Sequence, residues 1–193
     1  MNPRFLQVWH KLRSVALKRL PAISDILPVF AVITTMFYGW SMVVFLWKLP
    51  GWLYFLNIGE IAGIFAIQLL TNLIESLVGL LFLLAFSMAL PSRALKDVFI
   101  VRGSMATLVL IGSMMLFLNR YVSVGSAFGR NLFGWMLGAI VIAVVLAFLS
   151  TRVRFLSVSI SWISDQLIIF LFILMPLSAL SIIYAIFRFF ILG

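Results

Sequence analysis

One long apolar segment carries three polar side chains that could do chemistry, Gln68, Asn72 and Glu75. Their spacing of four and then three residues places them on one helical face, which Gly79 continues. A carboxylate inside a membrane costs roughly 2.5 to 3.5 kcal/mol unless it is protonated or paired, so this face should point into a bundle, a wet cavity or a partner. One interpretation is a site for an ion or a proton. The other is a set of hydrogen bonds that fixes packing between helices or subunits.

Arg102 is the obvious basic partner for Glu75, but position along the helices argues against a direct pair. Glu75 lies 15 residues from the end of its apolar run at Leu90, about 22 Å, whereas Arg102 lies only about 6 Å into its own run. We therefore expect Arg102 to extend toward lipid headgroups. The remaining basic candidates for Glu75 lie beyond the other end of its span: Lys48, Arg120 and Arg130.

The sequence carries no pattern typical of a catalytic or cofactor site. It has no cysteine and one histidine, His10, which excludes thiol chemistry, cysteine-ligated metals and a bis-histidine haem within one chain. It also has no glycine-rich phosphate loop, no HExxH and no carboxylate pair within one motif. We therefore expect no catalytic residues, no cofactor, no metal site and no enzymatic activity.

The composition indicates which solvent surrounds these residues. Hydrophobic residues make up 65% of the 193 residues. Charged residues make up 10%, whereas in soluble domains they make up roughly a quarter. The net charge is +9, but most Lys and Arg lie at the ends of apolar runs, where they act as topology signals rather than as a nucleic-acid surface. We predict an all-α integral membrane protein that contacts the lipid bilayer and binds no nucleic acid.

Five apolar runs are long enough to cross about 30 Å of hydrocarbon, which takes about 20 helical residues. The predicted spans of this transmembrane bundle, residues 26–193, are about 26–47, 66–90, 98–118, 132–150 and 166–187. Residues 53–65 are expected to be partly interfacial. Residues 155–165 are expected to form an interfacial elbow, with Ser164 or Asp165 capping the last span.

Small residues and one proline predict how the helices pack. Close contacts are expected where small residues cluster: at Gly59-x-x-x-Gly63, at Gly103 with Ser104, and at Gly134-x-x-x-Gly138. Pro176 should bend the last span and release a backbone carbonyl, which Ser178, Ser181 or a neighbouring span could help accommodate.

The first 25 residues are predicted to hold a cationic amphipathic helix that lies on the membrane surface. At 100° per residue, the polar face of this helix carries Arg4, Lys11 and Lys18. Together with Arg102, these are the candidate contacts to anionic headgroups on the cytoplasmic side. A mitochondrial presequence has a similar basic, acid-free composition and stays an alternative.

The distribution of basic residues predicts the orientation. Nine Lys and Arg flank the spans on the side of the N-terminus and four lie on the other side. Because basic flanks stay in the cytoplasm, we expect a cytoplasmic N-terminus, and five spans then place the C-terminus outside. A sixth span within residues 53–65 or 155–165 would instead place the C-terminus inside. The expected location is a bacterial inner membrane.

Two functions fit these observations. The first is a non-enzymatic subunit or scaffold of a larger membrane assembly, such as one of the cell envelope, in contact with other membrane chains or with copies of itself. The second is a small oligomeric channel or transporter whose polar pathway follows the face of Gln68, Asn72 and Glu75.

Overall fold

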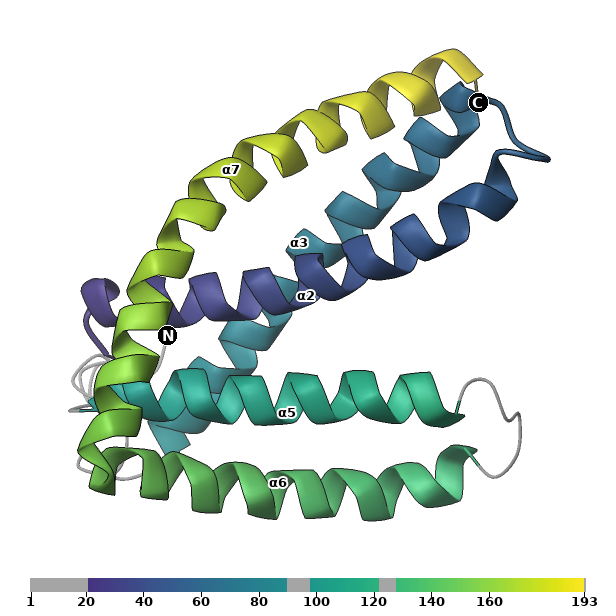
Figure 1. Ribbon diagram of the computed structural model, residues 1–193. Coiled ribbons are helices and arrows are strands. Elements are labelled where there is room, and N and C mark those ends of the chain that lie inside the picture. The colour runs from purple at the N-terminus through teal and green to yellow at the C-terminus, as the bar shows by residue number, and fades with distance from the viewer. Residues whose placement is uncertain (1–20, 90–97, 122–127, 193) are drawn as a thin grey trace, which may run out of the picture.

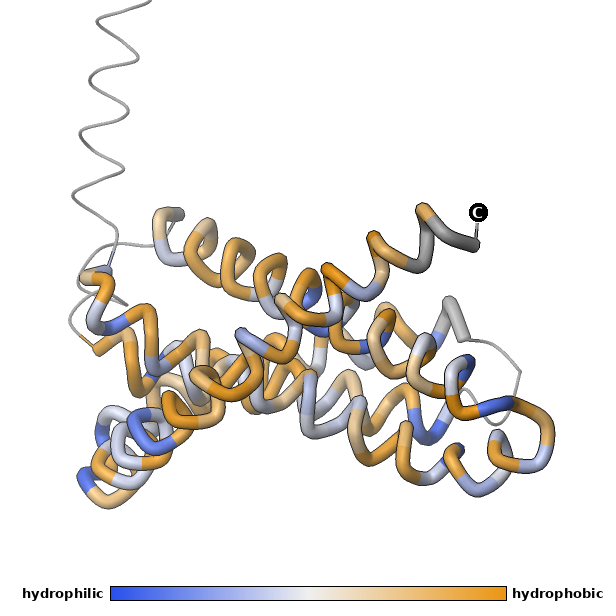
Figure 2. Tube along the Cα trace, turned by 90° about the horizontal axis from the view of Figure 1, so that it is seen from above, coloured by the Kyte–Doolittle hydropathy of each residue, from blue (hydrophilic) through white to orange (hydrophobic). Residues whose placement is uncertain are grey.

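The computed structural model describes residues 21–89, 98–121 and 128–192, and within these ranges the regular structure is entirely helical. Five long helices follow one another: α2 (Ile23–Trp52), α3 (Ile58–Ala89), α5 (Phe99–Tyr121), α6 (Phe128–Arg152) and α7 (Arg154–Leu192). Each is long and apolar enough to cross a membrane, which suggests a membrane location. Hydrophobic residues occur along the whole length of these helices (Figure 2). The prediction of five long apolar helices is therefore confirmed.

The predicted amphipathic helix lies outside the described residues. That helix carries three of the candidate headgroup contacts, Arg4, Lys11 and Lys18, and its structure stays a prediction.

Successive helices alternate in direction (Figure 1). One end of the bundle holds the start of α2 and the junction of α6 with α7 at Arg152 and Arg154; we call it the basic end. The other end holds Trp47 and Trp52 of α2 and Tyr121 of α5; we call it the aromatic end. Because the five helices alternate, α2 begins at the basic end and α7 ends at the opposite side of the bundle.

The start of α3 is fixed by a reciprocal cap. The backbone N–H of Asn57 donates to Glu60 Oε2 at 2.8 Å, and the backbone N–H of Glu60 donates to Asn57 Oδ1 at 2.9 Å. This capping box satisfies two backbone groups that lack helical partners. Most of the segment expected to be partly interfacial, residues 58–65, is therefore helical and continuous with the predicted span.

The last helix differs from the predicted elbow. α7 runs for 39 residues without interruption, so residues 155–165 form its first turns. Ser164 is fully buried, and its Oγ lies 2.9 Å from Ser104 Oγ of α5. Neither Ser164 nor Asp165 caps the helix, because both lie well inside it.

Pro176 lies inside α7, and the serines near it act locally. The hydroxyls of Ser178 and Ser181 donate to the carbonyls of Leu174 and Leu177, at 2.8 and 3.0 Å. In both bonds the serine hydroxyl donates to the carbonyl four residues earlier in its own helix, as serine commonly does. The carbonyl that a proline at 176 releases belongs to Phe172, so these two serines do not compensate it.

The helices α2, α3 and α7 pack together as one body. Tyr38 of α2 is only 5% exposed, and its hydroxyl donates to the Leu69 carbonyl of α3 at 3.1 Å. The oxygen of the same hydroxyl lies within hydrogen-bonding distance of Ser178 Oγ of α7. Nearer the aromatic end, the rings of Phe45 and Phe65 pack with their centroids 5.0 Å apart. One buried tyrosine thus joins α2, α3 and α7, which we call the three-helix body.

The other two helices, α5 and α6, form a hairpin that is held at both ends. Toward the aromatic end, Trp135 Nε1–H donates to the Ser113 carbonyl at 3.0 Å, and its ring packs on Phe117. At the basic end, Arg102 Nη2 of α5 donates to Thr151 Oγ1 of α6 at 3.0 Å.

The hairpin joins the three-helix body near the basic end. The buried side chains of Val29, Ile33, Leu83 and Phe99 form a core cluster there. A Cβ added to Gly103 would lie 3.4 Å from both methyl carbons of Val29 and 3.5 Å from Leu83 Cδ2. The predicted close contact at Gly103 is therefore present, since the backbone of α5 approaches α2 and α3 directly.

The glycine pair of α6 behaves differently. A Cβ added to Gly134 or Gly138 would meet no atom within 4 Å. The close contact predicted at these two glycines is not formed among the residues that the structure describes.

Candidate functional site

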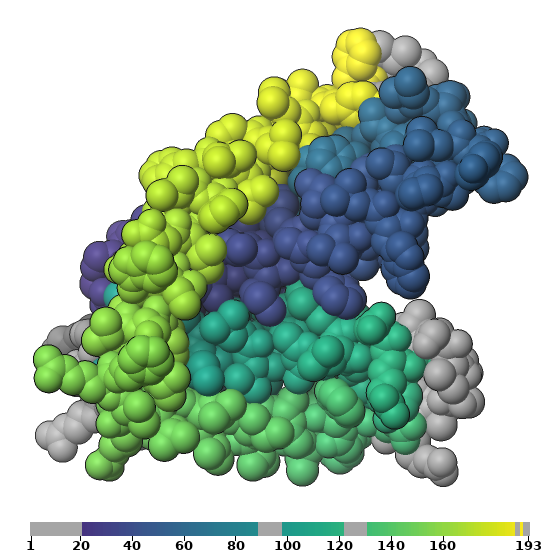
Figure 3. Space-filling view, in the orientation of Figure 1, coloured from purple at the N-terminus to yellow at the C-terminus, as the bar shows by residue number. Residues whose placement is uncertain are grey.

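A cavity of about 990 Å³ lies between the three-helix body and the hairpin, and we call it the cleft. α2 and α3 form one wall, and α5 and α6 form the other. The walls meet near Gly103 and diverge toward the aromatic end, as the space-filling view shows (Figure 3). Most lining side chains are apolar or aromatic, and the charged ones are Lys48, Glu75 and Arg102.

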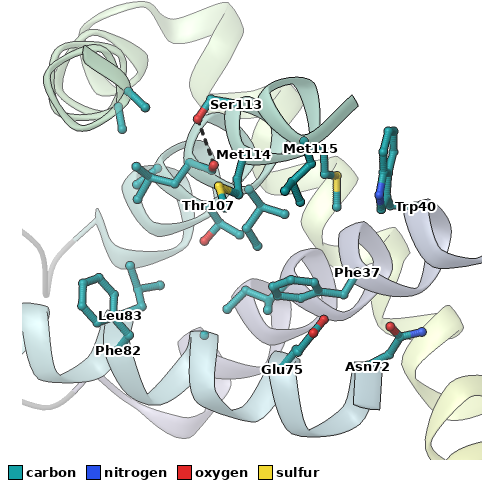
Figure 4. Close-up of a pocket in the computed structure, with 18 of the residues that line it drawn as sticks. Phe37, Trp40, Asn72, Glu75, Phe82, Leu83, Thr107, Ser113, Met114 and Met115 are labelled. Atoms are coloured by element: carbon teal, nitrogen blue, oxygen red, sulfur yellow. Dashed lines mark hydrogen bonds between the residues drawn. The ribbon is translucent and has the colours of Figure 1, made fainter. Parts of the chain in front are cut away.

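The polar face predicted from the sequence lines this cleft. Gln68, Asn72, Glu75 and Gly79 all belong to the wall that α3 contributes. Figure 4 shows Asn72 and Glu75 projecting from α3 on the side of the cleft. The helical spacing thus places the four residues on one surface, and that surface faces a cavity.

Gln68 is used to pack α3 on α2. Its Nε2 donates to the backbone carbonyl of Ser41 at 2.6 Å, and it is also hydrogen-bonded to the Ser41 hydroxyl. This pair matches the interpretation of the polar face as hydrogen bonds between helices.

Asn72 and Glu75 differ in exposure although they are one turn apart. Asn72 is 5% exposed, and its backbone carbonyl accepts a 2.7 Å hydrogen bond from the buried Ser76 hydroxyl. Glu75 is exposed, and its carboxyl group borders the cleft. The chemistry that this wall offers to another molecule is therefore mainly that of a carboxyl group in apolar surroundings.

Arg102 lines the same cleft at its basic end, well away from Glu75. A Cβ added to the neighbouring Gly103 would lie 3.5 Å from Leu83, and Leu83 lies eight residues along α3 from Glu75, about 12 Å. This offset agrees with the expectation that the two side chains form no direct pair. The Arg102 guanidinium lies 4.5 Å from the centroid of the Phe148 ring. Its contact with headgroups stays a prediction.

The opposite wall was not anticipated from the sequence. Thr107, Met114 and Met115 of α5 line the cleft across from Glu75 (Figure 4). Thr107 is 5% exposed and follows the buried Ser104 by three residues, so the two share a helical face. Ser104 contacts Ser164 of α7 and does not line the cleft, so no sequence signal in α5 sets the cleft wall apart from a packed helical face.

No protein-family model matches the chain, and no curated protein or solved structure is significantly similar to it. Among the residues that the structure describes, no group of three or more His, Asp or Glu side chains could hold a metal ion. The role of the cleft is therefore inferred from its geometry and chemistry.

Proposed function

We propose that the chain is a non-enzymatic subunit or scaffold of a larger membrane assembly, and that its cleft receives a transmembrane helix of another chain. The observation that carries the proposal is the exposure of the Glu75 carboxyl group in a cleft lined mostly by apolar side chains. In a bilayer such a group needs a hydrogen-bonding or basic partner. Lipid tails offer none, whereas a helix from another chain can.

The construction of the two walls supports this proposal. The Tyr38 hydrogen bonds brace one wall and the Trp135 hydrogen bond braces the other, while the two walls pack on each other at Gly103 near the basic end. A helix in the cleft would pack against exposed apolar side chains of both walls, such as Phe82 and Met136. Packing and interhelical hydrogen bonds, rather than the hydrophobic effect, drive such association in lipid.

A second candidate is the small oligomeric channel or transporter, which the position of Asn72 and Glu75 on a large cavity favours. Between Glu75 and Arg102, however, the α3 wall is apolar at Phe82, Leu83 and Phe86. A continuous polar pathway could therefore not follow the α3 wall alone and would need polar groups of the opposite wall or of further chains. The two candidate functions predict different effects of Glu75→Gln. If the chain is a transporter, the variant should abolish proton or cation flux in vesicles, and if it is a scaffold, the variant should assemble normally.

The direct test of the first proposal is photo-cross-linking from the cleft wall. If the chain is a scaffold, a photoreactive residue in this wall should capture a neighbouring protein chain, and one at a lipid-facing position should not.

We also infer a bacterial inner-membrane location with the N-terminus in the cytoplasm and the C-terminus outside. The nine-to-four distribution of basic residues supports this orientation. Reporter fusions should therefore place residue 1 and residue 193 on opposite sides of the membrane, with residue 1 inside. Both reporters in one compartment, or the N-terminal reporter outside, would contradict the orientation.

A further inference from the structure

The charge of Arg102 is held in a fixed place at the basic end of the cleft. Arg102 is the fourth residue of α5, within an apolar helix. Its Nη2 donates to Thr151 Oγ1 at 3.0 Å, and the guanidinium lies 4.5 Å from the centroid of the Phe148 ring. Both contacts come from α6. They orient the guanidinium in the lining of the cleft.

This fixed charge lies where the helices end. Thr151 is the second-last residue of α6, followed by Arg152, and Arg154 begins α7. Both arginines are exposed. With the helices placed across a bilayer, this level corresponds to the headgroup boundary, and on the proposed orientation it is the cytoplasmic one. Anionic lipids are enriched on that side.

An exposed apolar surface adjoins the charge. Phe86 of α3 and Val144 and Phe148 of α6 line the same cleft as Arg102, and all three are exposed. A cationic group beside an open apolar surface is complementary to a ligand with a negative group attached to a hydrocarbon chain.

We propose that the basic end of the cleft binds one anionic phospholipid. Its phosphate accepts hydrogen bonds from the Arg102 guanidinium, whose planar fork matches phosphate oxygens. One acyl chain lies along Phe86, Val144 and Phe148. Basic pockets between helices on the cytoplasmic side are typical sites for anionic headgroups. The level of Arg102 is about 12 Å along α3 from Glu75, so the lipid does not need the carboxyl group used in the proposed function.

Native mass spectrometry of the intact purified chain tests the proposal. The protein is exposed to equal amounts of phosphatidylglycerol and phosphatidylcholine, and the lipids that it retains are counted. The wild type should retain one phosphatidylglycerol in preference. Arg102→Gln should weaken that preference roughly tenfold, the size expected for losing a charged hydrogen bond. Lys48→Gln, with the same charge change at the aromatic end of the cleft, should leave it unchanged.

A second variant keeps the test decisive if Arg102→Gln does not fold. Val144→Trp leaves the guanidinium in place and fills the apolar surface beside it, so it should also reduce retention of phosphatidylglycerol. The proposal is overturned if Lys48→Gln loses as much lipid as Arg102→Gln, or if Val144→Trp retains as much as the wild type. Assembly with partner chains is measured separately, so failure of this site and failure of the subunit role remain distinguishable.

Discussion

Glu75→Leu is expected to weaken assembly with partner chains by about 1 to 2 kcal/mol, which is roughly a five- to thirtyfold rise in apparent Kd. Leucine removes the hydrogen-bonding group that borders the cleft and leaves a helix in the cleft without its polar contact. Glu75→Gln keeps the shape and the hydrogen-bonding capacity, so its assembly should stay close to that of the wild type. The measurement is a dilution series of the complex in mild detergent or in vesicles.

Thr71→Val is the matched control for this loss. Thr71 also lines the cleft from α3, but its hydroxyl already donates to the Ile67 carbonyl of its own helix at 2.9 Å. Removing this hydroxyl should leave assembly unchanged. Equal weakening by Thr71→Val and Glu75→Leu would show that the wall responds to any change of polarity, and an unaffected Glu75→Leu would remove Glu75 from the interface.

Gly103→Leu should strongly destabilise the fold itself. A Cβ at this position already lies 3.4 Å from Val29, so the further carbons of leucine would overlap Val29 and Leu83. Overpacking of this kind typically costs about 1 to 3 kcal/mol. The strain falls where the hairpin joins the three-helix body, so we expect the variant to unfold at a lower temperature than the wild type. The unfolding midpoint is measured in detergent by tryptophan fluorescence.

Gly134→Leu provides the control, because it makes the same chemical change in another helix. No atom lies within 4 Å of a Cβ at Gly134, so the variant should fold with a midpoint close to that of the wild type. If Gly103→Leu unfolds at the same temperature as Gly134→Leu, the close approach of α5 to α2 does not hold the bundle together.

The five helices could be predicted because each contains an apolar run long enough to span a bilayer. Their ends depended on local chemistry that hydropathy does not report. The Asn57-x-x-Glu60 capping box starts α3 well before the predicted span, and a cap of this type is recognisable in sequence. Ser164 was predicted as a cap, but its contact with Ser104 comes from α5, sixty residues away.

The candidate site was predictable only along one helix. The spacing of Asn72 and Glu75 placed them on a common face, because helical geometry is a local property. Which surface stands opposite depends on how α5 and α6 pack, and no periodicity within α3 encodes that. The contact of Arg102 with Thr151 spans 49 residues and could not be predicted for the same reason.

The most direct measurement of the central claim is photo-cross-linking in the native membrane at two matched phenylalanines. Phe82 lines the cleft and is 68% exposed, whereas Phe172 of α7 lies outside the cleft lining and is 72% exposed. With benzoylphenylalanine at each position in turn, the Phe82 site should give one discrete adduct with another protein chain, and the Phe172 site should not. That adduct should persist with Glu75→Gln and fade with Glu75→Leu. A cleft that yields only lipid adducts, or the same protein adducts as Phe172, would contradict a partner helix in the cleft.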